Sequence, residues 1–181
     1  KAFYLPPNIF NSAPLLLLTT DIPENDFLAR TITHKLYDAN EETRISQEIV
    51  LGIGGVKVLE SLQQKIDIYH MNEGHALPLV YELYDRFGDM ETVKEHTVFT
   101  THTPEDAGNE EHDINVLHKF GLFNGLNLET VRHITMTQGD TFNLTVGALR
   151  AVKLTNAVSK FHGEVANRMW KECEGRSEIT Y

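Results

Sequence analysis

The sequence is poor in the features that mark several large classes of protein, and each absence narrows the choice. Its 181 residues contain 16 Lys and Arg against 26 Asp and Glu, giving a formal net charge of −10 and no basic stretch to follow a phosphate backbone. The single cysteine, Cys173, cannot form an internal disulfide, and no charged leader or long apolar run marks a secretory or membrane segment. The sequence therefore disfavours nucleic acid and membrane as partners and predicts a cytoplasmic protein.

Motifs of several enzyme classes are missing as well. There is no G-x-S-x-G elbow for a serine hydrolase, and the glycines of residues 52–55 lack the spacing and position of a phosphate-binding loop, so close helix packing explains them better. His70 and His75 are five residues apart across a predicted strand end, unlike the H-x-x-x-H pair of a zinc helix. We therefore interpret His70, His75 and His102 as ordinary polar site residues rather than metal ligands.

What the chain does contain fits one globular domain, or part of a larger one. Hydrophobic residues make up 41% and charged residues 23%, enough for a substantial core. We treat residues 1–181 as a single α/β domain or a fragment. Because Lys1 stands where an initiator Met is usual and an apolar run follows within 15 residues, we expect an excised or cleaved segment.

Hydrophobic patterning predicts strands at residues 15–20, 65–72 and 97–102, separated by helical patterns. The helices are expected after Asp26, over residues 41–59 and over residues 74–87, which together give repeated βαβ units. Such units form a Rossmann-like, three-layer parallel sheet covered on both faces. Further helices are expected at residues 113–120, 128–134, 139–155 and 163–173, with residues 156–162 ambiguous between strand and turn.

Each predicted strand ends in polar residues. Since ligands bind beyond the carboxyl ends of parallel strands, we expect these residues to share one edge, with residues 104–112 as a loop or lid above it. They are Asp21, Asn72, Glu73, His75, His102 and Thr103.

Two kinds of chemistry suit this edge. Asp21 and Glu73 could form an acid/base pair, although helix capping or backbone hydrogen bonding is the better interpretation of each alone. Asn, His and Thr side chains offer donors and acceptors without demanding a charged ligand, which suits sugar hydroxyls. Carbohydrate is therefore the favoured ligand class.

Several stretches, in the right order along nearly the whole chain, resemble the α-glucan (glycogen, starch or maltodextrin) phosphorylases of bacterial and archaeal type. The matching stretches are R-I-S-Q-E-I-V-L-G-I-G-G-V at residues 44–56, H-M-N-E-G-H-A at 70–76, V-F-T-T-H-T-P at 98–104, A-G at 107–108, F-N-L-T at 142–145, A-L-R at 148–150, N-A-V-S-K-F-H-G-E-V at 156–165 and M-W at 169–170.

The resemblance implies the later part of the N-terminal domain of a two-domain glycosyltransferase of the GT-B kind. The parent would transfer a terminal α-1,4-linked glucosyl unit to inorganic phosphate, giving glucose 1-phosphate with retained configuration. Pyridoxal phosphate would relay a proton in the parent. The lysine that holds this cofactor and the phosphate-binding groups would lie in the C-terminal domain, absent from this chain, so we expect the segment alone to be inactive.

The same resemblance assigns site residues. It makes His102 the catalytic histidine, with its side chain at the 6-hydroxyl of the glucosyl unit and its carbonyl facing the reacting carbon. Asn72, Glu73 and His75 would position that histidine and the sugar, and Thr103 would be a weaker member. It assigns no cofactor-binding or metal-binding residue in this chain.

The sequence also departs from the family and leaves alternatives open. Residues 105–110 replace the V-P-A-G-H-D of many bacterial relatives, so contacts of that loop are not carried over. A stand-alone glucan-binding or interaction module is the alternative, with a nucleotide-sugar glycosyltransferase as a third hypothesis. The sequence leaves a homo-oligomer open.

Overall fold

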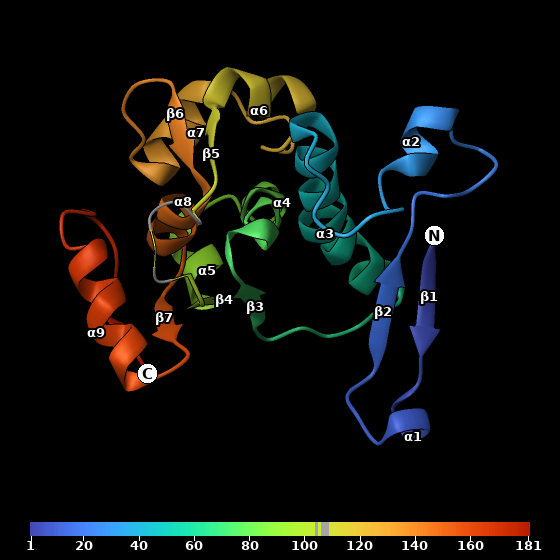
Figure 1. The fold of residues 1–181 in the computed structure, drawn as a ribbon, viewed down its shortest axis with the longest axis horizontal. Coiled ribbons are helices and arrows are strands. Elements are labelled where there is room, and N and C mark those ends of the chain that lie inside the picture. The colour runs from blue at the N-terminus through green and yellow to red at the C-terminus, as the bar shows by residue number, and fades with distance from the viewer. Residues whose placement is uncertain (104, 106–108) are drawn as a thin grey trace.

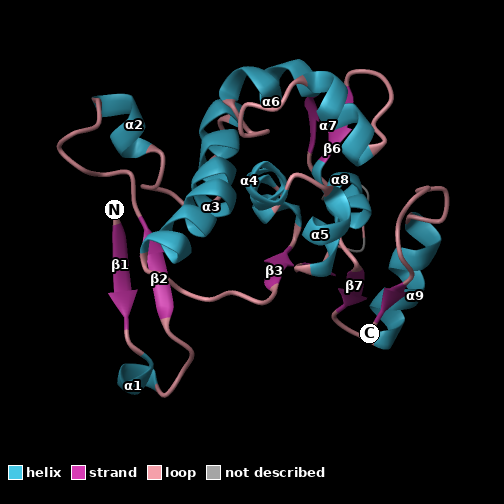
Figure 2. Ribbon diagram, turned by 180° about the vertical axis from the view of Figure 1, so that it is seen from behind, coloured by secondary structure: helices cyan, strands magenta, loops and turns pink. Residues whose placement is uncertain are grey.

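The computed structural model describes residues 1–103, 105 and 109–181 (Figure 1). An N-terminal arm of two strands and two short helices lies at one end of the molecule, and the C-terminal helix lies at the other. The long helix α3 (Glu41–Ser61) stands between the arm and the sheet in both views (Figures 1 and 2). Pro104, Ala107 and Gly108 of the expected strand-end loop lie outside the described residues.

The sheet next to α3 is parallel, as the sequence predicts. Among the described residues it has four strands in the order β3-β4-β7-β8, and all three pairings are parallel. The register aligns Asn72 with Thr100 and Thr100 with Asn156. The strands are β3 (Tyr69–Asn72), β4 (Thr97–Thr101), β7 (Leu154–Ala157) and β8 (Ile179–Thr180).

The prediction that the first apolar run joins this sheet is wrong. That run forms β2 (Leu15–Leu18), which pairs antiparallel with β1 (Ala2–Leu5) in a separate two-stranded hairpin. Helix α1 (Pro7–Phe10) lies in the hairpin connection, and α2 (Phe27–Thr31) follows it. β propensity predicted a strand correctly, but it carries no information about the partner of that strand.

Helix α3 is confirmed, together with the reason for one of its glycines. Asn40 caps it, since its side-chain oxygen accepts from the Thr43 amide at 2.9 Å. A Cβ added at Gly52 would lie 2.7 Å from the backbone nitrogen of Leu79, so only glycine lets the helices approach this closely. Gly55 has no such neighbour, so close packing explains Gly52 alone.

The connection from β3 to β4 is helical. The 3₁₀ turn η1 (Gly74–Ala76) leads into α4 (Pro78–Phe87), which starts at a proline and ends at Gly88 with φ +79°. Helix α5 (Met90–Glu95) follows, with Asp89 as its N-cap. The expected βαβ unit is therefore present.

The last third of the chain differs from the predicted pattern. The helix expected at residues 139–155 is divided into β6 (Thr141–Asn143), α8 (Leu144–Ala151) and the strand β7. Asn143 caps α8, and the chain becomes extended at Val152. The other elements of this part are β5 (Glu111–Asp113), α6 (Ile114–Phe120), α7 (Leu128–Thr135) and α9 (Lys160–Met169).

The core lies between the sheet and its helices. Its largest fully buried side chains include Met71 of β3, Phe99 of β4, Tyr81 of α4 and Leu144 of α8. Within the described part of the chain, none of the helices is long and apolar enough to span a bilayer. The strands β3 and β4, whose polar ends carry the candidate site, are thus held by a packed core.

Candidate functional site

The carboxyl ends of β3 and β4 bring four of the predicted site residues together. Asn72 is the last residue of β3 and Glu73 follows it, while His102 and Thr103 follow the last residue of β4. The strands pair in register, so these ends meet at the same edge of the sheet. Of the three strands that we expected to end at this edge, β3 and β4 do so.

Asp21 is not part of this edge. It follows the hairpin strand β2 and pairs with Arg30, whose Nε lies 2.7 Å from its Oδ1. The hydrogen bond with Arg30 is the main cause that lowers the pKa of this exposed carboxyl. Asp21 and Glu73 consequently do not form the acid/base pair that the sequence left open.

Glu73 joins the two strand ends. Its Oε1 accepts hydrogen bonds from the backbone N–H of His102 and from the Thr103 hydroxyl, the latter at 2.9 Å. Its own N–H donates to the Thr100 carbonyl at 3.0 Å. The backbone of Glu73 has φ +66° and ψ 172°, a conformation that costs a non-glycine residue about 1–3 kcal/mol. Strain of this kind persists where the surroundings enforce it and is common at functional sites.

The exposed side chains at this edge are Asn72 and His102. Their backbones are fixed by the β3–β4 ladder and by the Glu73 carboxylate, so both side chains start from rigid positions. Donor and acceptor groups on fixed backbone positions can orient a polyhydroxylated ligand.

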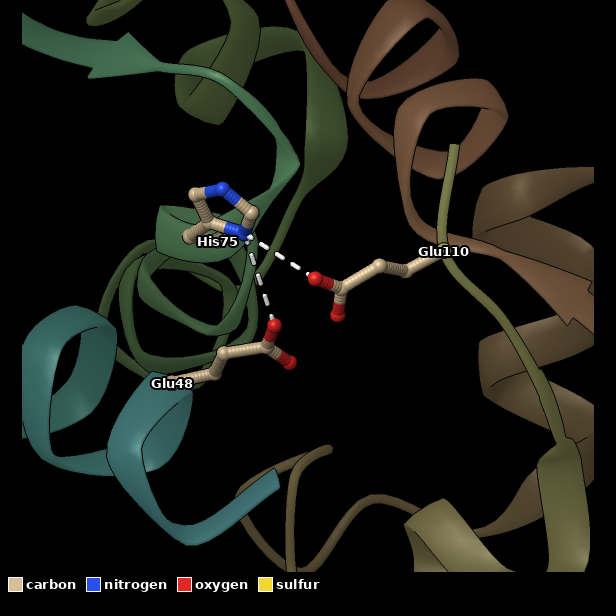
Figure 3. Close-up of side chains that lie close together, drawn as sticks. All are labelled: Glu48, His75 and Glu110. Atoms are coloured by element: carbon tan, nitrogen blue, oxygen red, sulfur yellow. Dashed lines mark ion pairs between the residues drawn. The ribbon is translucent and has the colours of Figure 1, made fainter. Parts of the chain in front are cut away.

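His75 lies one 3₁₀ turn further on and belongs to an ionic cluster with α3. Its Nδ1 is 3.0 Å from Nη2 of Arg44, and because a guanidinium only donates, Nδ1 is the acceptor. The same nitrogen lies 3.6 Å from Glu48 Oε1 and 3.8 Å from Glu110 Oε1 (Figure 3). The ring is therefore held between the long helix and the segment that precedes β5.

The cluster contains a buried carboxylate that no sequence motif indicates. The side chain of Glu48 is 1% exposed, and among the described residues neither of its oxygens has a hydrogen-bond partner. Burial raises its pKa to about 7. Glu48 lies on the apolar face of α3, between Ile45 and Gly52, so helical spacing alone could have identified it as a buried acid.

The second carboxylate of the cluster, Glu110, behaves in the opposite way. Burial acts to raise its pKa, but the neighbouring side chains of His112, Arg44 and Glu48 outweigh burial and hold the pKa well below the usual range. Arg44 Nη2 lies 2.6 Å from Glu110 Oε1. The interaction with Glu110 also raises the pKa of His112 to about 8. The two carboxylates thus differ strongly in their tendency to hold a proton.

Ligand atoms of Glu48, His75 and Glu110 lie within 4.8 Å of one another, the geometry of a candidate metal cluster. The guanidinium of Arg44 lies among them, within 3.7 Å of Glu48 Oε1. Because Arg44 already supplies a positive charge at this point, a metal ion would have to displace it. We therefore treat the cluster as an ion-pair network that fixes His75.

Two cavities border these residues. A small one of about 30 Å³, large enough for one water molecule, is lined by Glu73, His75, Thr103 and Glu110, with Gly74, Leu144 and Thr145. A groove of about 670 Å³ lies between the hairpin and α3, has mostly apolar walls and reaches Arg44 and His75 at one end. The walls of the groove come mainly from β2, α3 and the segment at residues 33–37, and the strand-end residues Asn72, Glu73 and His102 do not line it.

Comparison with known proteins gives the following relations. No family model matches the chain. Over 179 residues it is 50% identical to an uncharacterized protein of Methanocaldococcus jannaschii, a match that covers 99% of this chain and 34% of that protein. It is 36% identical over 167 residues to maltodextrin phosphorylase of Thermococcus litoralis, covering 87% of this chain and 20% of the enzyme.

A glycogen phosphorylase of Mycobacterium tuberculosis is 35% identical over 184 residues, covering 88% of this chain and 21% of the enzyme. This chain therefore spans about a third of the Methanocaldococcus protein and a fifth of the two phosphorylases. In sequence it is related to a segment of glycogen and maltodextrin phosphorylases.

Proposed function

We propose that this chain provides the sugar-facing strand ends of an α-glucan phosphorylase, which transfers a terminal α-1,4-linked glucosyl unit to inorganic phosphate. The observation that carries the proposal is the Glu73 carboxylate, which holds His102 and Thr103 from the neighbouring strand at the cost of a strained backbone. The sequence relation to two named phosphorylases supports the choice of reaction.

In this proposal Glu73 is a positioning residue and His102 contacts the substrate. The carboxylate fixes the N–H of His102, so that the imidazole and the carbonyl of the same residue project from a rigid strand end. The imidazole hydrogen-bonds a glucosyl hydroxyl. Asn72 offers a second donor and acceptor, and His75, held by Arg44, supports the η1 turn that follows Glu73.

The cofactor of the reaction would be bound by another part of the parent protein. Among the described residues that line the small cavity beside Glu73, the charged ones are the carboxylates Glu73 and Glu110, which would repel a phosphate group. This cavity therefore does not fit pyridoxal phosphate or substrate phosphate. The parent would have the GT-B arrangement, with this chain in one Rossmann-like half.

A chimeric enzyme tests the proposal. The segment of the Thermococcus litoralis maltodextrin phosphorylase that matches this chain is replaced by residues 1–181, and glucose 1-phosphate release from maltodextrin and phosphate is measured. We expect the chimera to be active and its His102→Ala variant to lose at least about 100-fold in kcat/KM, because a fixed group at the reacting sugar is removed.

His133→Ala is the matched control, since His133 is an exposed histidine of α7. It should leave the activity of the chimera unchanged. A His102→Ala chimera as active as the His133→Ala chimera would contradict the proposal. Release of glucose 1-phosphate by the 181-residue chain alone would also contradict it, because the phosphate-binding groups would then have to lie in this chain.

The alternative of a stand-alone glucan-binding module is separated by the chimera and calorimetry together. A module binds maltooligosaccharides by itself with an affinity that His102→Ala abolishes, and an inactive chimera together with such binding would favour it.

A further inference from the structure

A line of polar side chains crosses three neighbouring strands just before the strand-end edge. His70 of β3 places its Nε2 2.6 Å from the Thr100 hydroxyl of β4, and that hydroxyl donates to Oδ1 of Asn156 of β7 at 2.7 Å. Asn156 is the register partner of Thr100. The sequence assigns none of the three a specific contact or function at the site.

The hydrogen-bond chain has a defined direction. A threonine hydroxyl has one proton, and here Asn156 Oδ1 receives it. Thr100 must therefore accept its bond from His70, so Nε2 of His70 carries a proton. With Oδ1 occupied, Asn156 is left with its amide N–H groups, and their partner among the described residues is the Ala157 carbonyl at a long 3.4 Å.

Asn156 lies beside the residues already placed at the edge. It is the second-last residue of β7, and its register partner Thr100 precedes His102 by two residues, about 7 Å along an extended chain. The carbonyl of Thr100 also accepts from the N–H of Glu73. The carboxyl end of β7 therefore lies beside the ends of β3 and β4 at the same edge of the sheet.

We propose that Asn156 is a further ligand-binding residue of this edge, donating from its amide to a hydroxyl of a bound glucan, with Thr100 and His70 as positioning residues. The inference rests on the proposed function for the identity of the ligand. An amide that presents donors suits the oxygen of a neutral hydroxyl, and the nearby Glu73 carboxylate disfavours an anionic ligand.

The direction of the hydrogen-bond chain is tested without any ligand. Nitrogen NMR of the 181-residue chain at neutral pH reports which ring nitrogen of His70 is protonated, and we expect Nε2. Thr100→Val, which removes the hydroxyl but keeps a β-branched side chain, should abolish this preference, whereas Thr100→Ser should retain it. If only Nδ1 of His70 is protonated in the native protein, the hydrogen bonds run in the opposite direction. Asn156 would then donate its amide N–H to Thr100 and turn its carbonyl outward, which overturns the inference.

The binding role is tested by titrating the same chain with maltotriose to tens of millimolar. We expect the side-chain amide signals of Asn156 to shift together with His102, and Asn156→Asp, which keeps the acceptor for Thr100 but loses the donors, to weaken binding about fivefold to tenfold. Asn11→Asp is the matched control, because this substitution adds the same charge in the distant hairpin. This variant should bind like the native chain.

Two outcomes overturn the inference while leaving the proposed function to its own test in the chimera. In the first, His102 shifts, Asn156 does not, and Asn156→Asp binds like the native chain. In the second, maltotriose shifts no signal of the 181-residue chain at any concentration reached.

Discussion

The N-terminal arm and the sheet both contain apolar strand residues, but these residues have different environments. The run of four leucines in β2 leaves Leu15 and Leu17 about half exposed, and Phe27, Leu28 and Leu36 nearby are more than three-quarters exposed. In β4, by contrast, Phe99 is fully buried, and in the described part of the chain the buried apolar residues begin at Ile45. The sheet therefore carries the stability of the fold, and the arm adds little.

The difference teaches that apolar content predicts a strand but not its environment. β4 lies between two parallel neighbours and is covered by helices, whereas β2 has one partner in an isolated hairpin. A two-stranded hairpin alone is marginally stable in water. The rigid part of the molecule is thus the part that presents Asn72, Glu73 and His102, as a binding edge requires.

The largest expected effect compares the two regions directly. Phe99→Ala should lower the free energy of unfolding by about 3–5 kcal/mol, because it leaves a cavity in the core. Leu17→Ala in the arm should cost less than about 1 kcal/mol, since its side chain is 53% exposed. Urea denaturation measures both, and equal losses would show that the arm is packed as tightly as the sheet.

Two glycines of α3 sharpen the comparison within a single helix. Gly52→Ala should destabilise by about 1–3 kcal/mol, because the new methyl would meet the α4 backbone at Leu79. A Cβ added at Gly55 would meet no atom from outside its own helical turn within 4 Å. Gly55→Ala should therefore stabilise by about 0.5–1 kcal/mol through better helix propensity. Thermal unfolding measures the midpoint temperature of each variant. If both midpoints lay above that of the native chain, or both below it, this account of the α3–α4 contact would be contradicted.

The buried acid of α3 predicts a pH dependence. The pKa of Glu48 is raised to about 7, so its contribution to stability is present below about pH 4.5 and is lost as the pH rises through 7. Relative to Glu48→Gln, the native chain should therefore lose on the order of 1–3 kcal/mol between pH 4.5 and pH 7. Denaturation of both proteins across this range measures the difference. If the stability difference between the native chain and Glu48→Gln did not change with pH, the pKa of Glu48 would not be raised.

The smallest expected effect on stability is at the strand-end edge. Glu73→Gly relieves a backbone strain of about 1–3 kcal/mol while losing the acceptor for His102 and Thr103, so the free energy of unfolding should change by less than about 1 kcal/mol. NMR relaxation should nevertheless show increased backbone motion at His102. A large loss of stability with an unchanged His102 would mean that Glu73 serves the fold rather than the site.

The strands β3 and β4 and the helices before and between them could be predicted from the sequence because their signals are local. Asn40 and Asp89 cap the helices that they precede, Pro78 and Gly88 delimit α4, and the apolar period of α3 is regular. The polar residues that directly follow the apolar runs of β3 and β4 are a local signal too, and they predict that these side chains meet at one edge of the sheet. Asn72, Glu73 and His102 are found at that edge.

Other features could not be predicted because they depend on residues distant in sequence. The strand β8 is two residues long and exists through its pairing with Thr155 and Asn156. The helical spacing of Leu144 and Ala148 continues by coincidence into β7, which hid the break at Val152. Glu110 joins the cluster of Arg44 and His75 across 66 residues of sequence.

The sequence by itself determined the parallel βαβ unit, the polar strand ends and the relation to phosphorylases, because capping, periodicity and motif order are properties of short stretches. The tertiary structure alone decided that Asp21 lies away from the edge and that the carboxylate of Glu73 reaches across to His102. It also decided that Thr100 links His70 to Asn156. Strand partners and side-chain contacts between strands follow from packing, which no local pattern specifies.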